Sequence, residues 1–351
     1  MTFKIHNTEV GPNNSPFIIA EVSANHNGSI DTALKTIKAA KEAGASAVKI
    51  QTYTPDTMTI DCNQPDFLIE GGLWDGYNLY QLYKEAHTPF EWHERLFAYA
   101  AEIGITLFST PFDASAVSLL ESLNCPAYKV ASFEITDIPL LKAIARTKKP
   151  IIISTGLANP EEIAEAVQAV TDEGNTQLVL LHCISAYPTP VELMNLKAIE
   201  SLKVKFNVQV GLSDHSMGIA AANTAIALGA TVIEKHFILS RDLGGPDSSF
   251  SIEPSELKLL VKSCQQTQNS LGSGEISTSQ IESNNKKFRR SIYAVKDISK
   301  GDIITANDIK VIRPGFGLAP KHLEKVIGRK STQTILRGTP LSWSLLENTY
   351  E

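Results

Sequence analysis

Cysteine is scarce in this sequence, and long uninterrupted apolar runs are missing. The four cysteines stand far apart, without the paired spacing of a zinc site or a disulfide framework: Cys62, Cys125, Cys183 and Cys264. Scattered cysteines of this kind fit a reducing cytoplasm. No apolar run approaches the roughly 20 residues that a membrane-spanning helix needs, and the N-terminus lacks the cationic lead and apolar core of a signal peptide. We therefore expect a cytoplasmic protein without a membrane partner.

The sequence also lacks a strong excess of charge of either sign. The formal net charge is −6 over 351 residues, and acidic and basic side chains are interspersed. Such a chain does not attract nucleic acid or an anionic membrane, so neither is expected as a partner. Because 43% of the residues are hydrophobic, the chain can bury a large core. Its length predicts two domains, or one barrel with an appendage.

Strand-like and helix-like segments alternate from residue 17 onward. Eight short segments rich in β-branched or aromatic residues are predicted as strands: 17–23, 47–53, 105–112, 127–134, 150–156, 178–185, 208–213 and 232–238. Helices are predicted between and after them, among others at 31–45, 87–104, 159–170 (with Asn159 as its N-cap) and 254–268. Eight such units in about 255 residues predict an α/β fold, a closed (β/α)₈ TIM barrel. An open doubly wound sheet is disfavoured because no Gly-rich dinucleotide turn follows the first strand.

Two further segments do not fit the alternation. Residues 54–86 form an insertion, and connections longer than about 15 residues usually serve as lids or binding loops. Its aromatic residues either wall a substrate pocket or only pack the loop onto the barrel: Phe67, Trp74, Tyr77, Tyr80 and Tyr83. Residues 269–288 are polar and rich in Gly and Ser, which predicts a linker. This linker divides a barrel domain at 1–268 from a small, mostly β domain at 289–351.

Polar residues gather where the predicted strands end, and in a parallel barrel these ends face one cavity. Lys49 and Lys129 lie inside strands, although lysine is rarely buried without a partner. Hydroxyl, amide and carboxyl groups accompany them: Glu21, Gln51, Ser109, Thr110, Ser132, Glu134, Ser154, Thr155, Ser185 and Tyr187. Ammonium groups among hydroxyls suit a phosphate or carboxylate ligand. The alternative is a structural ion pair with Glu21 or Glu134.

Two histidines mark the ends of the last two predicted strands. His215 and His236 are 21 residues apart, with Ser213 and Glu234 beside them. Neighbouring strands would bring the two imidazoles together on one cation and leave coordination positions for substrate and water. Mn²⁺, Fe²⁺, Co²⁺ and Zn²⁺ all fit two histidines with oxygen donors. The alternative is that each is a half-buried structural histidine. Of the remaining histidines, one is expected near the substrate (His26) and three at the surface or at helix caps (His87, His93 and His322).

These residues make the chain resemble the sialic acid synthase family, whose members condense phosphoenolpyruvate (PEP) with an N-acetylated amino sugar. The matching motifs span essentially the whole chain: IAEVSANHNG, AVKIQTY, FSTPFD, KVASFEITD, ISTG, CISAYPTP, GLSDHSMG, VIEKHF and IRPGFG. The segments QTYTPDTMTID and LGGPDSSFS look most like the pseudaminic acid branch, which takes 2,4-diacetamido-2,4,6-trideoxy-L-altrose. The alternative within the family is a neuraminate or legionaminate synthase that takes an N-acetylmannosamine-type sugar.

The resemblance implies the ligands of each candidate site residue. A divalent metal ion, Mn²⁺ or Mg²⁺ with Co²⁺ as a further option, would be held by His215 and His236. PEP would be bound by Lys49, Thr110, Lys129, Ser132, Ser154, Ser185, Ser213 and His215. The sugar would contact Glu21, Gln51, Tyr187, Asp247 and Phe288, with Arg313 reaching in from the other subunit. Ser185 departs from the neuraminate branch, which tends to have Asn at this position.

The resemblance further implies the chemistry and the assembly. The catalytic groups would be Glu21, Glu134, Glu234, His215 and His236, with Glu134 or Glu234 as the acid–base group. The C-terminal region resembles an antifreeze-like (SAF) domain, which in the family covers the partner's barrel in a domain-swapped homodimer. Two other functions remain open: a metal-dependent class II aldolase or sugar epimerase that uses no PEP, and an ice- or carbohydrate-binding module. The second is disfavoured because the SAF-like region lacks a regular Thr ladder.

Overall fold

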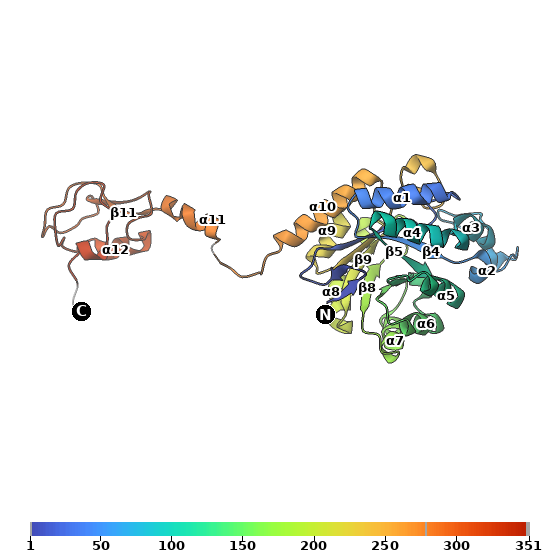
Figure 1. The fold of residues 1–351 in the computed structure, drawn as a ribbon. Helices are drawn as coiled ribbons and strands as arrows, with labels where there is room; N and C mark the ends of the chain where they lie inside the picture. Colours follow the sequence, from blue (N-terminus) through green and yellow to red (C-terminus); the bar gives the residue numbers. More distant parts are fainter. Residues whose placement is uncertain (1, 278, 349–351) are drawn as a thin grey trace. The chain divides into compact units, whose positions relative to one another are not determined.

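The computed structural model describes residues 2–277 and 279–348. The chain divides into two compact units (Figure 1), the first ending at Gly272 and the second beginning at Ser273. Each unit packs around an apolar core of its own. The last helix of the first unit, α10 (Pro254–Ser270), ends inside the segment predicted as a linker. In the described part of the chain, no helix combines the length and the apolar character needed to cross a bilayer.

Eight parallel strands close into a barrel, which confirms the predicted (β/α)₈ fold. These strands are β3 (Phe17–Glu21), β4 (Ala47–Thr52), β5 (Thr106–Pro111), β6 (Tyr128–Val130), β7 (Ile151–Ser154), β8 (Leu178–Cys183), β9 (Gln209–Asp214) and β10 (Val232–His236). The barrel closes because β10 pairs with both β9 and β3. All eight strand predictions coincide with barrel strands. Nearly every strand residue is buried, as expected where helices cover a parallel sheet.

Helices surround the strands (Figure 1). They are α1 (Ile30–Glu42), α4 (His93–Ile103), α5 (Ala114–Ser122), α6 (Ile138–Arg146), α7 (Pro160–Asp172), α8 (Ala198–Phe206), α9 (Ala220–Ala227) and the helix α10. The helix predicted at 87–104 begins later than expected, at His93, after a 3-10 turn that follows Pro89. Proline disfavours helical geometry in the residue before it, which explains the late start.

Strand register decides which side chains enter the barrel. Ser213 on β9 lies opposite Glu234 on β10, and the two are hydrogen bonded at 3.0 Å. Glu234 also reaches lysines on β4 and β6, so this face of the strands is the barrel interior. The next pair along the two strands is Asp214 and Lys235. Because successive side chains of a strand point to opposite faces, Asp214 and Lys235 point outward, toward the covering helices.

Short elements complete the first unit at both ends of the barrel. At the amino-terminal end, β1 (Phe3–Ile5) and β2 (Thr8–Val10) form a hairpin whose Ile5 and Val10 are fully buried. At the carboxyl end, the insertion at 54–86 folds into α2 (Pro55–Met58) and α3 (Leu79–Ala86). A bridge between Leu68 and Asn78 closes the turn between these two helices. The insertion is therefore a folded element.

The second unit is a small β domain with little helix, as expected. Its strands β11 (Ser291–Ala294) and β12 (Ile309–Ile312) pair in antiparallel fashion, and its helices are the short α11 (Gln280–Ser283) and α12 (Leu323–Val326). A compact apolar core holds it together: Ile292, Ala294, Ile298, Ile304, Ile309, Val326, Ile335, Leu341 and Leu346.

Asn159→Ala should lower the free energy of unfolding by about 1 kcal/mol. The side-chain oxygen of Asn159 caps α7 by accepting hydrogen bonds from the backbone amides of Glu161 and Glu162. The backbone amide of Asn159 donates to the Glu162 carboxylate. Urea unfolding followed by circular dichroism measures the difference. Glu165→Ala, at an exposed position of the same helix, is the control. Equal stability of the two variants would contradict the role of the cap.

Candidate active site

Two lysines and two carboxylates are buried together in the barrel interior. Lys49 Nζ lies 2.8 Å from Glu21 Oε2 and 3.7 Å from Glu234 Oε2. Lys129 Nζ lies 3.8 Å from Glu234 Oε1. None of the four residues is more than 5% exposed. The ion pair considered as the alternative for Lys49 is therefore present, with Glu21, but Glu234 also stands between the two lysines.

The four charges shift one another's pKa values. Burial raises the pKa of Glu21, and Lys49 offsets this only in part. Burial acts in the same direction on Glu234, yet Lys129 and Lys49 outweigh it and hold the pKa of Glu234 below its usual range. Burial lowers the pKa of Lys129. The ionised Glu234 is thus the counter-charge of both ammonium groups, and an anionic ligand that reaches the lysines would take over this role.

Hydroxyl groups complete the environment of the two ammonium groups. Lys49 Nζ donates a hydrogen bond to Thr110 Oγ1 at 3.0 Å. Lys129 Nζ donates to Ser154 Oγ at 2.7 Å and to the carbonyl of Val130 at 2.8 Å. Ammonium and hydroxyl donors at these positions match the oxygen atoms of a phosphate or a carboxylate.

Two hydroxyl groups approach the backbone of Gly156 closely beside this cluster. A methyl group on Gly156 would lie 2.4 Å from Ser185 Oγ and 2.7 Å from Ser132 Oγ. The amide of Gly156 donates to Ser132 Oγ at 3.1 Å. Two hydroxyls and a backbone amide therefore converge where only glycine fits, next to the strand end that carries Ser154.

The two imidazoles lie face to edge across the end of β9 and β10. The ring centroids of His215 and His236 are 5.4 Å apart. The Nδ1 of His215 lies 3.1 Å from the carbonyl of Ile184. Because a carbonyl only accepts hydrogen bonds, Nδ1 carries a proton and Nε2 is the nitrogen left to bind a cation. Burial lowers the pKa of His215, but Cys183 and the Ile184 carbonyl outweigh it and raise this pKa above its usual value. Burial and the nearby cationic groups hold the pKa of His236 well below its usual range, so His236 is neutral.

These features fit a divalent cation in an open site. His236 Nδ1 is buried without a hydrogen-bond partner, and Asp247 Oδ2 lies 3.7 Å from it. A neutral imidazole nitrogen without a partner is the donor that Mn²⁺, Co²⁺ or Zn²⁺ binds. No three His, Cys, Asp or Glu side chains of residues 2–277 and 279–348 form a closed metal site. A cation held by His215 and His236 would therefore need oxygen atoms of substrate or water as further ligands.

A cavity of about 390 Å³ adjoins the His236 imidazole. Predicted site residues line one side of it: Gln51, Glu134, Tyr187, His236 and Asp247. The insertion supplies another side, largely apolar: Met58, Ile69, Trp74, Leu79, Leu82 and Tyr83. Of the five aromatic residues of the insertion, Trp74 and Tyr83 thus wall the cavity, whereas Tyr77 is exposed.

Tyr187 links the insertion to the imidazoles. Its ring centroid lies 4.3 Å from that of His215 and 5.6 Å from that of Trp74. The Trp74 indole donates a hydrogen bond to the carbonyl of Pro246 at 3.2 Å, one residue before Asp247. The insertion is therefore fastened over the same cavity that the strand ends open into.

Some residues of this region were not predicted. Ser23 accepts a hydrogen bond from the Gln51 amide at 3.0 Å, and Gln51 also donates to Glu21 at 2.9 Å. Phe250 packs on both Tyr187 and His236. Ser23 could have been predicted, because it is a polar residue at the end of the first barrel strand. No sequence signal distinguishes Phe250 from an ordinary core residue.

Two predicted site residues belong to the second unit. Phe288 and Arg313 are both exposed there, and their participation in a site stays a prediction. The prediction for His93 was wrong in its burial: His93 is fully buried, donates from Nδ1 to the Pro89 carbonyl and contacts Thr52 Oγ1 at 2.8 Å. His26, expected near the substrate, is also buried, and its ring packs edge-on against Trp92.

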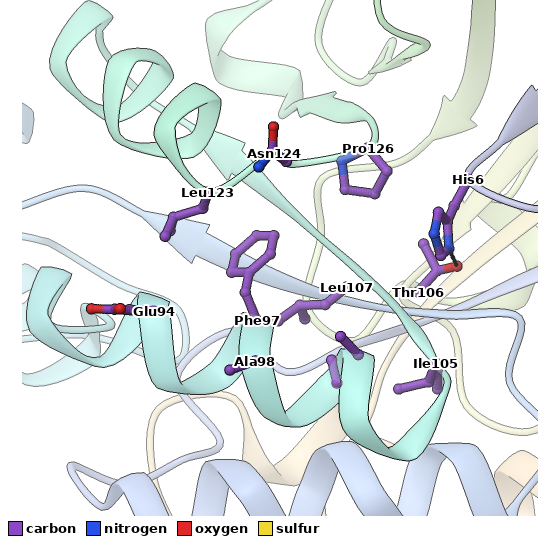
Figure 2. Close-up of a pocket in the computed structure, with 12 residues that line it drawn as sticks. His6, Glu94, Phe97, Ala98, Ile105, Thr106, Leu107, Leu123, Asn124 and Pro126 are labelled. Carbon is purple, nitrogen blue, oxygen red and sulfur yellow. Dashed lines mark hydrogen bonds between the residues drawn. The ribbon is translucent and has the colours of Figure 1, made fainter.

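A second cavity, of about 350 Å³, lies at the amino-terminal end of the barrel. Figure 2 shows Phe97, Leu107 and Leu123 along its wall, and the hydrogen bond between His6 and Thr106 at its rim. Its lining is mainly apolar and comes from α4, the start of β5 and the segment after α5. It contains none of the residues predicted for the site, and we interpret it as a packing gap between helices.

Family models match both units of the chain. The NeuB family model covers residues 36–276, and the SAF domain model covers residues 289–347. A pseudaminic acid synthase from Campylobacter jejuni is 49% identical over 328 residues, which are 93% of this chain and 96% of that protein. A pseudaminic acid synthase from Helicobacter pylori is 45% identical over the same share of this chain and 96% of its own. An N,N'-diacetyllegionaminic acid synthase from Legionella pneumophila is 38% identical, with 94% of each chain covered.

Solved structures agree with this relationship. The N-acetylneuraminic acid synthetase of Leptospira borgpetersenii, solved in complex with citrate, is similar with a TM-score of 0.74 and 33% sequence identity. The match covers 81% of this chain and 95% of that chain.

Gly156→Ala should weaken the binding of an anionic ligand by about tenfold or more, because the added methyl group displaces the hydroxyls of Ser132 and Ser185. Calorimetric titration with phosphoenolpyruvate measures the change. Gly174→Ala is the control: Gly174 has φ = 71° at the end of α7, so alanine there strains the backbone without touching the cavity. Gly156→Ala with wild-type affinity would contradict this role of Gly156.

Proposed function

We propose that this chain, which belongs to the NeuB family of sialic acid synthases, condenses phosphoenolpyruvate with 2,4-diacetamido-2,4,6-trideoxy-L-altrose and water, giving pseudaminic acid and inorganic phosphate. The observation that carries the proposal is the pair of buried lysines, Lys49 and Lys129, beside two imidazoles at the mouth of one barrel. Relatives at 45–49% identity are named pseudaminic acid synthases, and the legionaminic acid synthase is more distant at 38% identity.

The cavity wall favours this sugar over N-acetylmannosamine. The insertion presents apolar side chains to the cavity, among them Met58, Ile69 and Leu82. A methyl group at carbon 6 and the methyl groups of two acetamido substituents bury well against such a wall. N-acetylmannosamine has hydroxyl groups at carbons 4 and 6, and these would lose hydrogen bonds to water there. A neuraminate-type substrate is the alternative.

Lys49 and Lys129 would hold the carboxylate and phosphate of phosphoenolpyruvate, with Thr110 and Ser154 as further donors. In the reaction, carbon 3 of phosphoenolpyruvate forms a bond to the aldehyde carbon of the open-chain sugar. Water adds at carbon 2, and the bond between carbon 2 and the phosphate ester oxygen breaks, so that phosphate leaves. The lysines contribute by fixing the reacting carbon atoms at short distance and by balancing the charge of the leaving phosphate.

His215 and His236 would hold a divalent cation, Mn²⁺, Mg²⁺ or Co²⁺, which when bound would act as a Lewis acid toward the aldehyde carbonyl. The protein's part is to orient both imidazoles and to keep His236 neutral. The Ile184 carbonyl fixes the proton of His215 on Nδ1, and burial keeps His236 uncharged.

The two candidate acid–base groups have opposite pKa shifts. Burial raises the pKa of Glu134 to about 7, and Glu134 lines the cavity proposed for the sugar. Glu234 stays ionised between the lysines. We therefore assign Glu134 as the acid that protonates the aldehyde oxygen, and Glu234 as the base that accepts a proton from the attacking water.

A domain-swapped homodimer is part of the proposal. Residues 273–351 contain 13 Lys and Arg and 8 Asp and Glu, a net charge of +5, which leaves −11 on residues 1–272. The two units therefore carry net charges of opposite sign, which favours their association. Phe133 and Leu157, which follow β6 and β7, are 64% and 71% exposed, and Phe288 and Phe316 of the second unit are 55% and 68% exposed.

We also place the enzyme in the cytoplasm, because its four cysteines are free thiols.

Phosphate release from phosphoenolpyruvate with Mn²⁺ tests the proposed reaction directly. One reaction receives 2,4-diacetamido-2,4,6-trideoxy-L-altrose and a parallel one N-acetylmannosamine. We expect the first sugar to react at least about 100-fold faster. Faster release with N-acetylmannosamine would assign the chain to the neuraminate branch, and release with neither sugar would favour the aldolase.

The pH profile of kcat tests the role of Glu134. The pKa of Glu134 is raised to about 7, so its acid form is populated below pH 7, and kcat should fall as the pH rises through about 7. Glu134→Gln should lower kcat by about 10²–10⁴-fold and remove this limb of the profile. Glu192→Gln, at an exposed position, is the control. A Glu134→Gln enzyme with the wild-type profile would exclude Glu134 as the acid.

Complementation tests whether Arg313 acts in the partner's site. His215→Ala and Arg313→Ala homodimers should each be inactive. A heterodimer of the two, purified through two different tags, has one site with both residues intact and should regain about half of the wild-type activity. A heterodimer of His215→Ala with Lys129→Met, both in the barrel, should regain none. Full activity of the Arg313→Ala homodimer, or no rescue, would contradict the swapped arrangement.

A further inference from the structure

An ion pair is buried on the outer face of the barrel, behind the two imidazoles. Lys235 Nζ lies 2.8 Å from Asp214 Oδ2, and both side chains are 1% exposed. The preceding pair on the same face of the same two strands is apolar: Leu212 lies opposite Ile233, and both are fully buried. The outer face therefore changes from apolar to ionic at the last register position before the imidazoles.

The ion pair holds the backbone on both sides of His215. Asp214 precedes His215, and its Oδ1 accepts hydrogen bonds from the Ser216 amide at 2.9 Å and from the Ser216 hydroxyl at 2.7 Å. Lys235 Nζ also donates to the carbonyl of Ser216. The residues before and after His215 are thus tied to one ammonium group.

The same lysine stands directly between two residues of the candidate site. Its chain neighbours are Glu234 and His236, whose side chains point into the barrel because strand side chains alternate. One buried ammonium group therefore connects the segment that carries His215 with the segment that carries His236.

An ion pair in this position needs a reason other than stability. Replacing a buried ion pair by apolar side chains of similar volume is often neutral or stabilising. The neighbouring Leu212 and Ile233 show that apolar side chains pack well on this face. Apolar side chains at positions 214 and 235 would fill the space, but they would leave the Ser216 amide and carbonyl without their present partners.

We propose that Lys235 and Asp214 are positioning residues that fix the distance and orientation of His215 relative to His236 for a shared divalent cation. This inference rests on the proposed function, because it assumes that the two imidazoles act together. It assigns no contact with substrate to either residue. Outer residues that orient metal-binding imidazoles typically change metal affinity or activity by about 10–100-fold when they are replaced.

The test compares two double variants in the full chain. Asp214→Asn with Lys235→Met removes both charges together, so no buried charge is left unpaired. Glu121→Gln with Lys149→Met is the control, because that partly exposed ion pair joins the end of α5 to the segment before β7, at the other end of the barrel.

Mn²⁺ affinity, measured by calorimetry without substrate, is the primary measurement. The Asp214/Lys235 variant should bind Mn²⁺ about 10–100-fold more weakly and lose a similar factor in kcat, while KM for phosphoenolpyruvate stays within about twofold. The control variant should match the wild type in Mn²⁺ affinity, kcat and KM, whatever it loses in melting temperature. Wild-type Mn²⁺ affinity in a folded Asp214/Lys235 variant would overturn the proposal.

Hydrogen exchange on the metal-free wild-type protein gives a second test that needs no variant. If the ion pair orders this segment, the Ser216 amide should exchange as slowly as the amides of β9, and rapid exchange would overturn the proposal. The outcomes also separate the two proposals. A wild-type enzyme that releases no phosphate refutes the proposed function, whereas wild-type turnover with unchanged Mn²⁺ affinity in the variant refutes only the positioning role.

Discussion

The burial of two ammonium groups in one barrel interior is the constraint on which the rest of the site depends. A charge removed from water is stable only if it is paired and hydrogen bonded, so Lys49 and Lys129 require the carboxylates and hydroxyls that surround them. Glu234 satisfies both lysines at once, at 3.7 and 3.8 Å, and neither contact is a close ion pair. The lysines are therefore stable in the free protein and remain available to an anion. Lys49 has in addition a close ion pair with Glu21, at 2.8 Å, so Lys129 is the less tightly paired of the two lysines.

The sequence was most informative where a physical rule links chain order to position. Alternating strands and helices predicted the barrel, and the ends of parallel strands predicted that Lys49, Lys129, His215 and His236 lie together. The rule works because eight parallel strands must all end on the same side. It predicts the neighbourhood of a side chain, and it says nothing about which atom receives each hydrogen bond.

Other features could not be predicted because they depend on tertiary contacts. His93 begins a helix, and its position in the sequence does not reveal that its two ring nitrogens form hydrogen bonds with Thr52 and with the carbonyl of Pro89. The contact of Trp74 with Tyr187 joins residues 113 positions apart through a folded insertion. Asp214 and Lys235 are plainly polar in the sequence, but their outward direction follows from strand register, which the sequence alone leaves open. The participation of Phe288 and Arg313 in the site stays a prediction, because both residues belong to the second unit.

Tyr187 has a consequence for how the site distinguishes sugars. Its ring packs against Trp74 of the insertion on one side and against His215 on the other. A sugar that fits poorly would keep the insertion from packing, and the displaced Tyr187 ring would leave His215 without its neighbour. Such a sugar could still enter the cavity beside bound phosphoenolpyruvate, yet it would react slowly. Discrimination would then appear in turnover rather than in affinity, as in enzymes whose selectivity arises from induced fit.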